Sequence, residues 1–463
     1  MKNIAVIGGG LSGLTFTYFL DKLATIKSKK INIDIIEQNS DFAKSKICNF
    51  QYNQEIYDNG WHNTIKDNGI LFQMILELGL YRYLIESKQT VKVIYDGNDL
   101  KNIPEKIFFG YPLDKGQLLS SDIFNLKEKI SIFMKLHKNS KLYDISKITV
   151  EDFFLSKINS TVYDKLIEPI LTSHYGSDIS KQSFSLVLPD LAFATIKNSD
   201  VENVINEMYK SNISDNILYG KEYRLKFTLK SLIESLESHL SNKVFREFNS
   251  KVTSIEKHKK GYIITYGDKK RYYDQVIITS KHTDFLSFFE DDKRLKKYYK
   301  ELTFTSNIVA TLLVKKENLN INSNIGDVIF SEENKYISKV EYVSNKWIDI
   351  KSQNIHLLRV YINRQDRVNE ILDKSDCEIE NIILKELSSI HKNLVIEKAF
   401  INKIDKNYIY ANIKYSKYIN EIEKYLSTNY DKIYFIGNSK KAINLENTII
   451  ESREVARYIV EKI

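Results

Sequence analysis

The order of elements at the start of the chain constrains its fold more than any other feature. Ile4 to Ile7 form a short, uninterrupted apolar run, which is typical of a strand buried on both faces of a parallel sheet. A glycine-rich turn follows, then a helical pattern over Leu11 to Leu23 and a second apolar strand over Ile31 to Ile36. This order predicts a βαβ unit and places the chain in the α/β class.

The turn has the spacing Gly-x-Gly-x-x-Gly, and the second strand ends at an acid. Glycines allow main-chain N–H groups to approach a pyrophosphate, and the N-terminus of the next helix favours an anion. The acid can accept hydrogen bonds from the hydroxyls of an adenosine ribose, whereas it disfavours the 2′-phosphate of NADP. We therefore predict a dinucleotide site at Gly8, Gly9, Gly10, Leu11, Ser12, Gly13, Glu37 and Gln38.

A secretory signal peptide is the rival interpretation of the N-terminus, because Lys2 precedes an uncharged stretch from Asn3 to Leu20. Three successive glycines are poor in a signal helix, no good small-residue cleavage site follows, and the βαβ pattern continues without a break. These features favour a cytoplasmic protein, with attachment to a membrane surface left open.

The composition excludes several classes of protein. A chain of 463 residues exceeds one ordinary core, so two or three lobes are expected. Its two cysteines, Cys48 and Cys377, are far apart and outside any Cys/His cluster, so neither a disulfide framework nor a metal site is indicated. The net charge of +8 is spread along the chain, so nucleic-acid binding is not expected. Beyond the first βα unit, no apolar stretch has the length of a transmembrane span.

The middle of the chain begins with a helical part. A helix is predicted around Ile70 to Leu84, and residues 103–111 have an extended pattern. From Ser120 to Phe154 the pattern is helical again, with apolar residues at the spacing of a buried helix face: Ile123, Leu126, Ile130 and Phe133.

Strands dominate the second half. A β-meander that returns to the first sheet is predicted by five segments: Val244–Phe248, Lys251–His258, Tyr262–Tyr266, Lys269–Tyr273 and Gln275–Thr279. A second sheet is predicted from segments that include Ser306–Val314 and Ile355–Asn363. At the end we expect a strand over Lys432–Ile436, a turn at Gly437-Asn438 and a helix over Ile449–Ile459.

Taken together, these segments resemble the FAD-dependent amine oxidase superfamily, and within it the protoporphyrinogen oxidases most closely. The glycine turn with Glu37 is similar to the opening of that family, and Asp58-Asn59-Gly60-Trp61-His62 resembles its acid-x-Gly-x-His turn. The segment Leu166 to Leu171, which contains Glu168-Pro169, is similar to a Glu-Pro segment of protoporphyrinogen oxidases. Near the end, Tyr434 to Asn438, followed by Ile449 and Arg453-Glu454, resembles the part that closes over the flavin.

The resemblance implies FAD as the cofactor and adds residues to its site. It places Val252 where family members give a main-chain contact to adenine, and it adds Gly60, His62, Gly437, Asn438 and Ile449. Three departures stand against it. The Arg-x-Gly-Gly element that usually follows the ribose-binding acid is absent between Ser40 and Lys46, and only Gly220 remains of a double glycine. Glu446 and Ser452 stand where a proline and a glycine are usual.

By the same resemblance, the fold is α/β, or α+β overall: a Rossmann-type FAD-binding domain with a discontinuous substrate domain of sheet and helices. We expect the FAD-binding domain at residues 1–85, 215–285 and 395–463, and the substrate-domain sheet at 286–394. Residues 86–214 would form a helical lobe that holds substrate or associates with a membrane, with Lys127, Lys129 and Lys135 available for anionic lipid.

The implied function is an FAD-dependent oxidoreductase that dehydrogenates a bulky, ring-containing substrate by hydride transfer to flavin N5, as in porphyrin biosynthesis. Oxygen or another acceptor would then take up the electrons. Because the flavin supplies the chemistry, no catalytic side chain is predicted. Arg359 and Arg364 are candidates to pair with substrate carboxylates, and exposure on the surface is the alternative for both.

Two other functions stay open. An amine oxidase or carotenoid-desaturase-type enzyme would keep the flavin, with an aromatic cage for an amine or a long apolar tunnel for a polyene. A cationic rim around a flat slot would instead favour a tetrapyrrole. The missing glycines motivate a third hypothesis, a degenerate and non-catalytic binding protein, which predicts that added FAD is not taken up.

Overall fold

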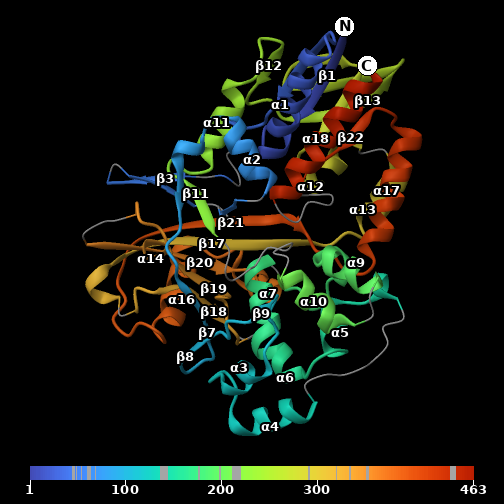
Figure 1. Ribbon diagram of the computed structural model, residues 1–463. Helices are drawn as coiled ribbons and strands as arrows, with labels where there is room; N and C mark the ends of the chain where they lie inside the picture. The colour runs from blue at the N-terminus through green and yellow to red at the C-terminus, as the bar shows by residue number, and fades with distance from the viewer. Residues whose placement is uncertain are drawn as a thin grey trace.

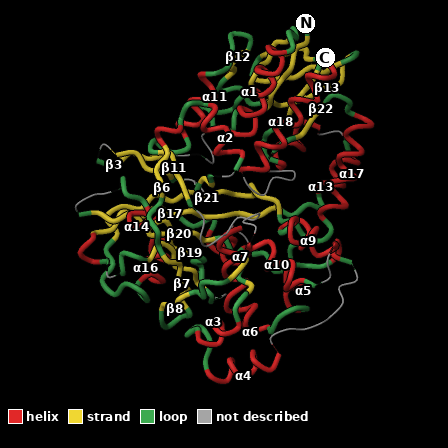
Figure 2. The backbone as a smooth tube through the Cα atoms, in the orientation of Figure 1, coloured by secondary structure: helices red, strands yellow, loops and turns green. Residues whose placement is uncertain are grey.

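The computed structural model describes residues 1–43, 47, 49–53, 55–59, 64–67, 69–135, 144–175, 178–197, 200–210, 221–289, 292–319, 321–332, 335–350, 354–437 and 445–463. Figure 1 shows a sheet near both termini at one end of the molecule, a second sheet across the middle, and a group of helices at the other end. Figure 2 shows the same division, with the helical group below the strands.

Five parallel strands form the first sheet, in the order β12-β2-β1-β16-β22. In that order they span Val244–Glu247, Ile31–Ile36, Lys2–Ile7, Gln275–Ile278 and Ile433–Phe435. The sheet grows outward in both directions from β1, and a doubly wound sheet forms its ligand crevice at such a switch point. The predicted βαβ unit and the return of residues 275–278 to the first sheet are confirmed.

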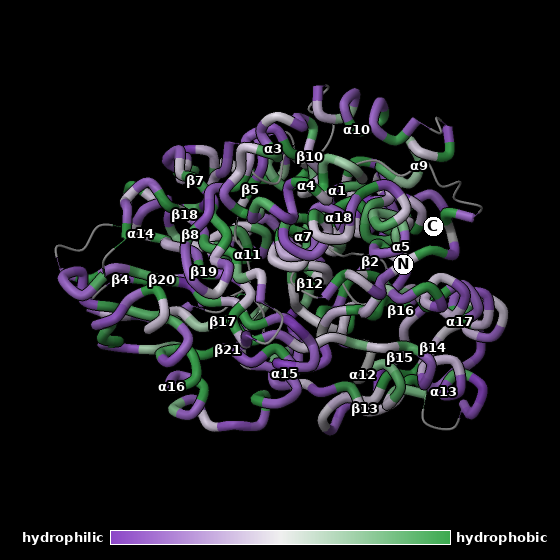
Figure 3. Tube along the Cα trace, turned by 90° about the horizontal axis from the view of Figure 1, so that it is seen from below, coloured by the Kyte–Doolittle hydropathy of each residue, from purple (hydrophilic) through white to green (hydrophobic). Residues whose placement is uncertain are grey.

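The residues of β1 alternate between two cores, as the two-residue period of a strand requires. Ile4 and Val6 face the side covered by α1 (Leu11–Ile26), α11 (Lys230–Ser238) and α18 (Leu445–Lys462). Ala5 and Ile7 face the side covered by the meander of β13 (Val252–His258), β14 (Gly261–Tyr266) and β15 (Lys269–Tyr273). Behind the meander lie α13 (Lys293–Tyr299) and α17 (Tyr415–Asn429), which are largely hydrophilic in Figure 3.

A second sheet has the order β21-β17-β20-β19-β18-β7-β8 in the described part of the chain. These strands are Ile396–Ile409, Phe304–Lys315, Ile355–Ile362, Lys339–Tyr342, Ile325–Phe330, Val91–Tyr95 and Leu100–Asn102. One face is apolar and packs on α15 (Gln365–Ile371) and α16 (Asp376–Leu387). The proposed division into domains stays a prediction, and the strands of this sheet come from three separate stretches of sequence.

The helical lobe has its own apolar core. Its helices are α3 (Lys115–Ser120), α4 (Leu126–Lys135), α5 (Val150–Leu155), α6 (Ser160–Val162), α7 (Glu168–Tyr175), α8 (Phe184–Val187), α9 (Pro189–Lys197) and α10 (Val201–Lys210). Within the described ranges, no helix combines the length and the hydropathy that a bilayer crossing needs.

Two predictions about helices are wrong in part. The helix expected over 70–84 ends early, because α2 spans Ile70–Glu77 and Gly79 then adopts a left-handed φ of +71°. The helix face expected to be buried in 120–154 is mostly exposed: Ile123 is buried, but Leu126, Ile130 and Phe133 are 75 %, 52 % and 76 % exposed. Periodicity shows that a helix has an apolar face, but it does not show what covers that face.

Candidate functional site

A cavity of about 270 Å³ lies at the C-terminal ends of β1, β2 and β16. Its wall includes seven of the predicted cofactor residues: Gly8, Gly10, Leu11, Ser12, Glu37, Gln38 and Val252. Four other predicted residues lie behind this wall. Three are glycines in or against the turn (Gly9, Gly13 and Gly437), and Ile449 belongs to the apolar core. Gly60, His62 and Asn438 lie outside the described residues.

Each glycine of the turn has a distinct packing role. Gly8 has a φ of +106°, and a Cβ added to it would lie 2.7 Å from Oγ1 of Thr279. A Cβ at Gly13 would lie 2.1 Å from the carbonyl oxygen of Gly8, so the helix can approach the turn only because that side chain is absent. A Cβ at Gly10, on the cavity wall, would meet nothing within 4 Å.

Glu37 is buried at the end of β2 and braces the turn. Its Oε2 accepts a hydrogen bond from the backbone N–H of Gly9 at 2.7 Å. Its Oε1 accepts from the backbone and side-chain nitrogens of Asn39, at 2.8 and 2.7 Å. A carboxylate offers about four acceptor positions, so these three bonds leave room for a ribose hydroxyl on the cavity side.

The C-terminal segment is held against the first turn of α1. Gly437 has a φ of +109°, and its N–H donates to Oε2 of Glu451 at 2.9 Å. A Cβ on Gly437 would lie 2.7 Å from Oγ of Ser12. Oγ of Ser452 also reaches Ser12, donating to its carbonyl oxygen at 3.3 Å. The serine that replaces a usual glycine therefore ties α18 to the glycine turn.

Glu446, the other unusual residue of this segment, serves a different helix. Its Oε2 accepts a hydrogen bond from the backbone N–H of Leu71 at 3.0 Å, in the first turn of α2. A carboxylate at a helix N-terminus satisfies a donor that the helix itself cannot pair, and it interacts favourably with the helix dipole. Both departures thus have structural roles.

The cavity fits a dinucleotide. The first turn of α1 holds no acidic residue, and Gly10 gives no side-chain cap, so the first N–H groups point at the cavity without a competing anion. The N-terminal positive end of α1, the open space at Gly10 and the carboxylate of Glu37 lie on one continuous wall. This is the donor and acceptor set that a pyrophosphate and a ribose require.

A second polar region covers the other face of the second sheet. The register places Asp327 opposite Glu341, Glu341 opposite Arg359, and Lys339 opposite Tyr361. All five side chains point to the same face and are at most 6 % exposed. An interior sheet face is normally apolar, so a run of buried charges on adjacent strands marks this face as unusual.

Lys346 connects the acids of this charged sheet face. Its Nζ lies 2.9 Å from Glu222, 3.3 Å from Glu341 and 3.5 Å from Asp327. Burial opposes its charge, but the three acids outweigh that effect and hold the pKa of Lys346 well above its usual value.

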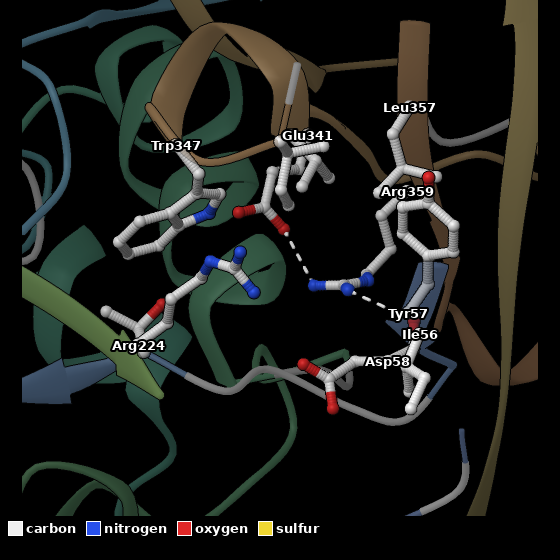
Figure 4. A pocket seen from close by; sticks show the side chains of 11 residues that line it. Ile56, Tyr57, Asp58, Arg224, Glu341, Trp347, Leu357 and Arg359 are labelled. Atoms are coloured by element: carbon white, nitrogen blue, oxygen red, sulfur yellow. Dashed lines mark hydrogen bonds and ion pairs between the residues drawn. The ribbon is translucent and has the colours of Figure 1, made fainter. Parts of the chain in front are cut away.

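Arg359 joins the charged sheet face to the Asp58 turn. It pairs with Glu341 at 3.4 Å and donates from Nη2 to the carbonyl oxygen of Asp58 at 3.2 Å. Figure 4 shows these contacts around a cavity of about 20 Å³, room for a single water, with Arg224 and Trp347 on the opposite wall.

Two groups near this face have shifted pKa values. Burial lowers the pKa of Lys339 to about 8, although Asp327 and Glu341 oppose the shift. Desolvation, followed by the charges of Lys92, Lys66 and Lys339, lowers the pKa of His174 to about 3, so this imidazole is neutral at physiological pH. Burial is the main cause of both shifts, and nearby lysine charges add to the shift of His174.

The two arginines proposed for substrate carboxylates are both buried, so the surface alternative is wrong. Arg364 forms two contacts with Glu168 of the Glu-Pro segment, at 2.9 and 3.2 Å, and thereby ties α7 to the end of β20. Arg359 is paired with Glu341. Each arginine therefore already has an acidic partner within the protein.

Sequence reasoning missed part of both regions. Ser250, Lys251, Thr279, Ser280 and Lys281 also line the large cavity. A usable signal was present, because these residues follow the parallel strands β12 or β16, and ligands bind at the carboxyl ends of parallel strands. The charged sheet face could have been found from the alternation of charged and apolar residues in Lys339-Val340-Glu341.

A doubly wound parallel sheet with a glycine turn at its switch point defines a nucleotide-binding protein of the Rossmann type. The chain belongs to the flavin containing amine oxidoreductase family, which matches residues 42–460. It is thus a flavin-dependent oxidoreductase, as the resemblance in the sequence implied.

Known proteins resemble the chain over its whole length. It is 25 % identical to coproporphyrinogen III oxidase of Staphylococcus aureus, with 100 % of both chains covered. It is 23 % identical to protoporphyrinogen oxidase of Dictyostelium discoideum, over 98 % of each chain. Among solved structures, a protein from Exiguobacterium sp. assigned as a protoporphyrinogen oxidase superposes with a TM-score of 0.86 at 18 % identity, covering 100 % of this chain and 99 % of the other.

Proposed function

We propose that this protein uses FAD to dehydrogenate a porphyrinogen, a reduced cyclic tetrapyrrole that carries carboxylate groups. The single observation that carries the choice of substrate is the charged sheet face. The names of the two relatives, a coproporphyrinogen III oxidase and a protoporphyrinogen oxidase, agree with it.

Residues of the large cavity would hold the adenosine diphosphate part of FAD. The N–H groups from Gly10 to Ser12 would bind the pyrophosphate, Glu37 the ribose, and the main chain of Val252 the adenine. Bound FAD would supply the hydride acceptor, at N5 of its ring system. By the family resemblance, that ring would lie near Gly60, His62 and Asn438, which are outside the described residues.

The charged sheet face supports an anionic substrate. Among the described residues at this face, five cations (Lys66, Lys92, Lys339, Lys346 and Arg359) face four acids (Asp58, Glu222, Asp327 and Glu341). Burying one charge without a compensating opposite charge costs on the order of several kcal/mol. A protein keeps such a cost where function requires it. A substrate carboxylate would balance the extra positive charge.

The same face argues against the other substrates. A cationic amine would be repelled by the surplus positive charge, and a polyene offers these groups no hydrogen bond. The intact cavity wall argues against a degenerate protein that has lost its flavin, because the glycine turn and Glu37 keep the required geometry.

Anaerobic titration of the purified flavoprotein tests this proposal. Coproporphyrinogen and protoporphyrinogen should each bleach the absorption of oxidised flavin, whereas a primary amine and a carotene should not. Bleaching by the amine or the carotene, with neither porphyrinogen active, would overturn the choice of substrate. Heat-released FAD identified by chromatography would check the cofactor independently of turnover.

We further propose that this protein is cytoplasmic and meets a membrane surface through α4. Leu126, Ile130, Phe133 and Met134 are 52–76 % exposed on this one helix, and Lys127 and Lys129 are available for anionic headgroups. Co-sedimentation with vesicles rich in phosphatidylglycerol should retain the wild type and release Phe133→Asp. Equal retention of both proteins would refute the contact.

A further inference from the structure

Two lysines line the large cavity although the nucleotide motif does not call for either of them. Lys251 directly precedes β13, and Lys281 follows the end of β16. Among the described residues that line the cavity, the charged groups are these two lysines, Glu37 and Asp284. The wall is therefore neutral only because the lysines are present.

A dinucleotide bound in this cavity is negatively charged, so the wall must compensate that charge. A dinucleotide brings two phosphate charges, and without the lysines the described part of the wall would present two carboxylates and no positive side chain to it. The family resemblance implies an Arg-x-Gly-Gly element after the ribose-binding acid, but the segment from Ser40 to Lys46 has no arginine, and its Lys44 and Lys46 lie outside the described residues. A substitute cation is thus expected within reach of the diphosphate.

The surroundings of the two lysines separate their roles. Thr279 donates from Oγ1 to the carbonyl oxygens of Ile7 and Gly8, at 3.0 and 2.9 Å, so the strand end that leads into Lys281 is fastened to the glycine turn. Lys251 lies at the end of the cavity near the ribose-binding acid, because its neighbour Ser250 donates its N–H to the carbonyl oxygen of Glu37 at 2.9 Å. Lys281 is the lysine beside the phosphate-binding turn.

We propose that Lys281 neutralises the diphosphate of the bound dinucleotide and takes the place of the missing arginine. This inference rests on the proposed binding of FAD and adds a specific ionic contact to it. Lys281 is half-buried, which shields the pair from full screening by solvent. An ammonium can serve a phosphate as a point charge, although without the bidentate geometry of a guanidinium.

Ligand affinity measured on flavin-free protein tests the contact without any need for turnover. FAD, ADP and adenosine are titrated into the wild type, Lys281→Gln, Lys281→Arg and Lys270→Gln, using flavin fluorescence for FAD and calorimetry for the others. Lys270 is an exposed lysine of β15 away from the cavity wall, so its variant makes the same charge change elsewhere. Each affinity is measured at low and at high salt.

We expect Lys281→Gln to bind FAD and ADP about tenfold more weakly, the factor for losing one charge-assisted hydrogen bond, with adenosine unchanged. Lys281→Arg and Lys270→Gln should match the wild type, and added salt should weaken the wild type more than Lys281→Gln. Unchanged FAD affinity in Lys281→Gln, or an equal loss for adenosine, would overturn the inference. A wild type that binds no flavin would instead refute the proposed function.

Discussion

Replacing Lys339 by methionine tests whether the charged sheet face binds the substrate. Lys339 is 5 % exposed, and its pKa is lowered to about 8. With that pKa, the ammonium is about 90 % protonated at pH 7 and about 10 % at pH 9. If the ammonium binds a substrate carboxylate, the KM of the wild type should rise about tenfold between pH 7 and pH 9.

Lys339→Met should bind the substrate more weakly, but its folded state should be more stable than that of the wild type at neutral pH. The pKa of Lys339 falls from 10.5 to about 8 on folding, so the protonated form is disfavoured in the folded state. The free-energy cost of burying the protonated ammonium is fully present below pH 8, and it disappears as the pH rises toward 10.5. A shift of this size corresponds to about 3 kcal/mol. Lys339→Met should therefore be more stable than the wild type at pH 7 and lose that advantage at alkaline pH.

The assay combines initial rates, followed by porphyrin fluorescence, with urea unfolding at several pH values. Lys339→Met should show a high KM that does not change between pH 7 and pH 9, and Lys339→Arg should keep a low KM at both. Exposed Lys270→Met is the control for a general loss of charge. If the KM of Lys339→Met rises with pH as steeply as that of the wild type, Lys339 does not bind the substrate.

Three further changes test the packing of the site. Arg364→Ala leaves Glu168 buried without its cation and should lower the free energy of unfolding by about 3–5 kcal/mol, whereas the double variant Glu168→Gln/Arg364→Met should recover most of it. Gly13→Ala puts a methyl 2.1 Å from the carbonyl oxygen of Gly8, so the purified protein should lose its bound flavin, and full retention would contradict the tight turn. Glu446→Ala should lower the unfolding free energy by about 1 kcal/mol through loss of the α2 cap, which thermal melts can detect.

Local patterns in the sequence were sufficient to predict the βαβ unit of the first sheet, whereas Val244–Glu247, which was expected in the meander, joins this sheet beside β2. The apolar run Ile4–Ile7, the turn glycines and the second strand are contiguous, so periodicity and turn chemistry act within one segment. The strands of the meander were predictable for the same reason, since each pairs with its sequence neighbour. Six residues on the cavity wall follow from this local information, and Val252 follows from the family resemblance.

Only one strand of the charged sheet face could be predicted in this way, from the alternation in Lys339-Val340-Glu341. Glu222 is far in sequence from Asp327 and Lys346, and Lys346 meets Glu222 only in the folded protein. Arg364 and Glu168 show the same limit, because an isolated arginine in a sequence is expected on the surface until its buried partner is known. The prediction that the apolar face of α4 is buried was wrong for a related reason. The periodicity of a helix does not show whether another element covers its apolar face.

The position of β1 at the centre of its sheet has a consequence for biosynthesis. Ile4 pairs with Ile33 on one side but with Gln275 on the other, and the last strand comes from Ile433–Phe435. A ribosome would release the nucleotide motif long before the strands that enclose it exist. Such distant pairings slow folding and leave sheet edges open to other chains. The nascent polypeptide should therefore depend on chaperones until its final helix emerges, and early supply of the flavin should not rescue a truncated chain.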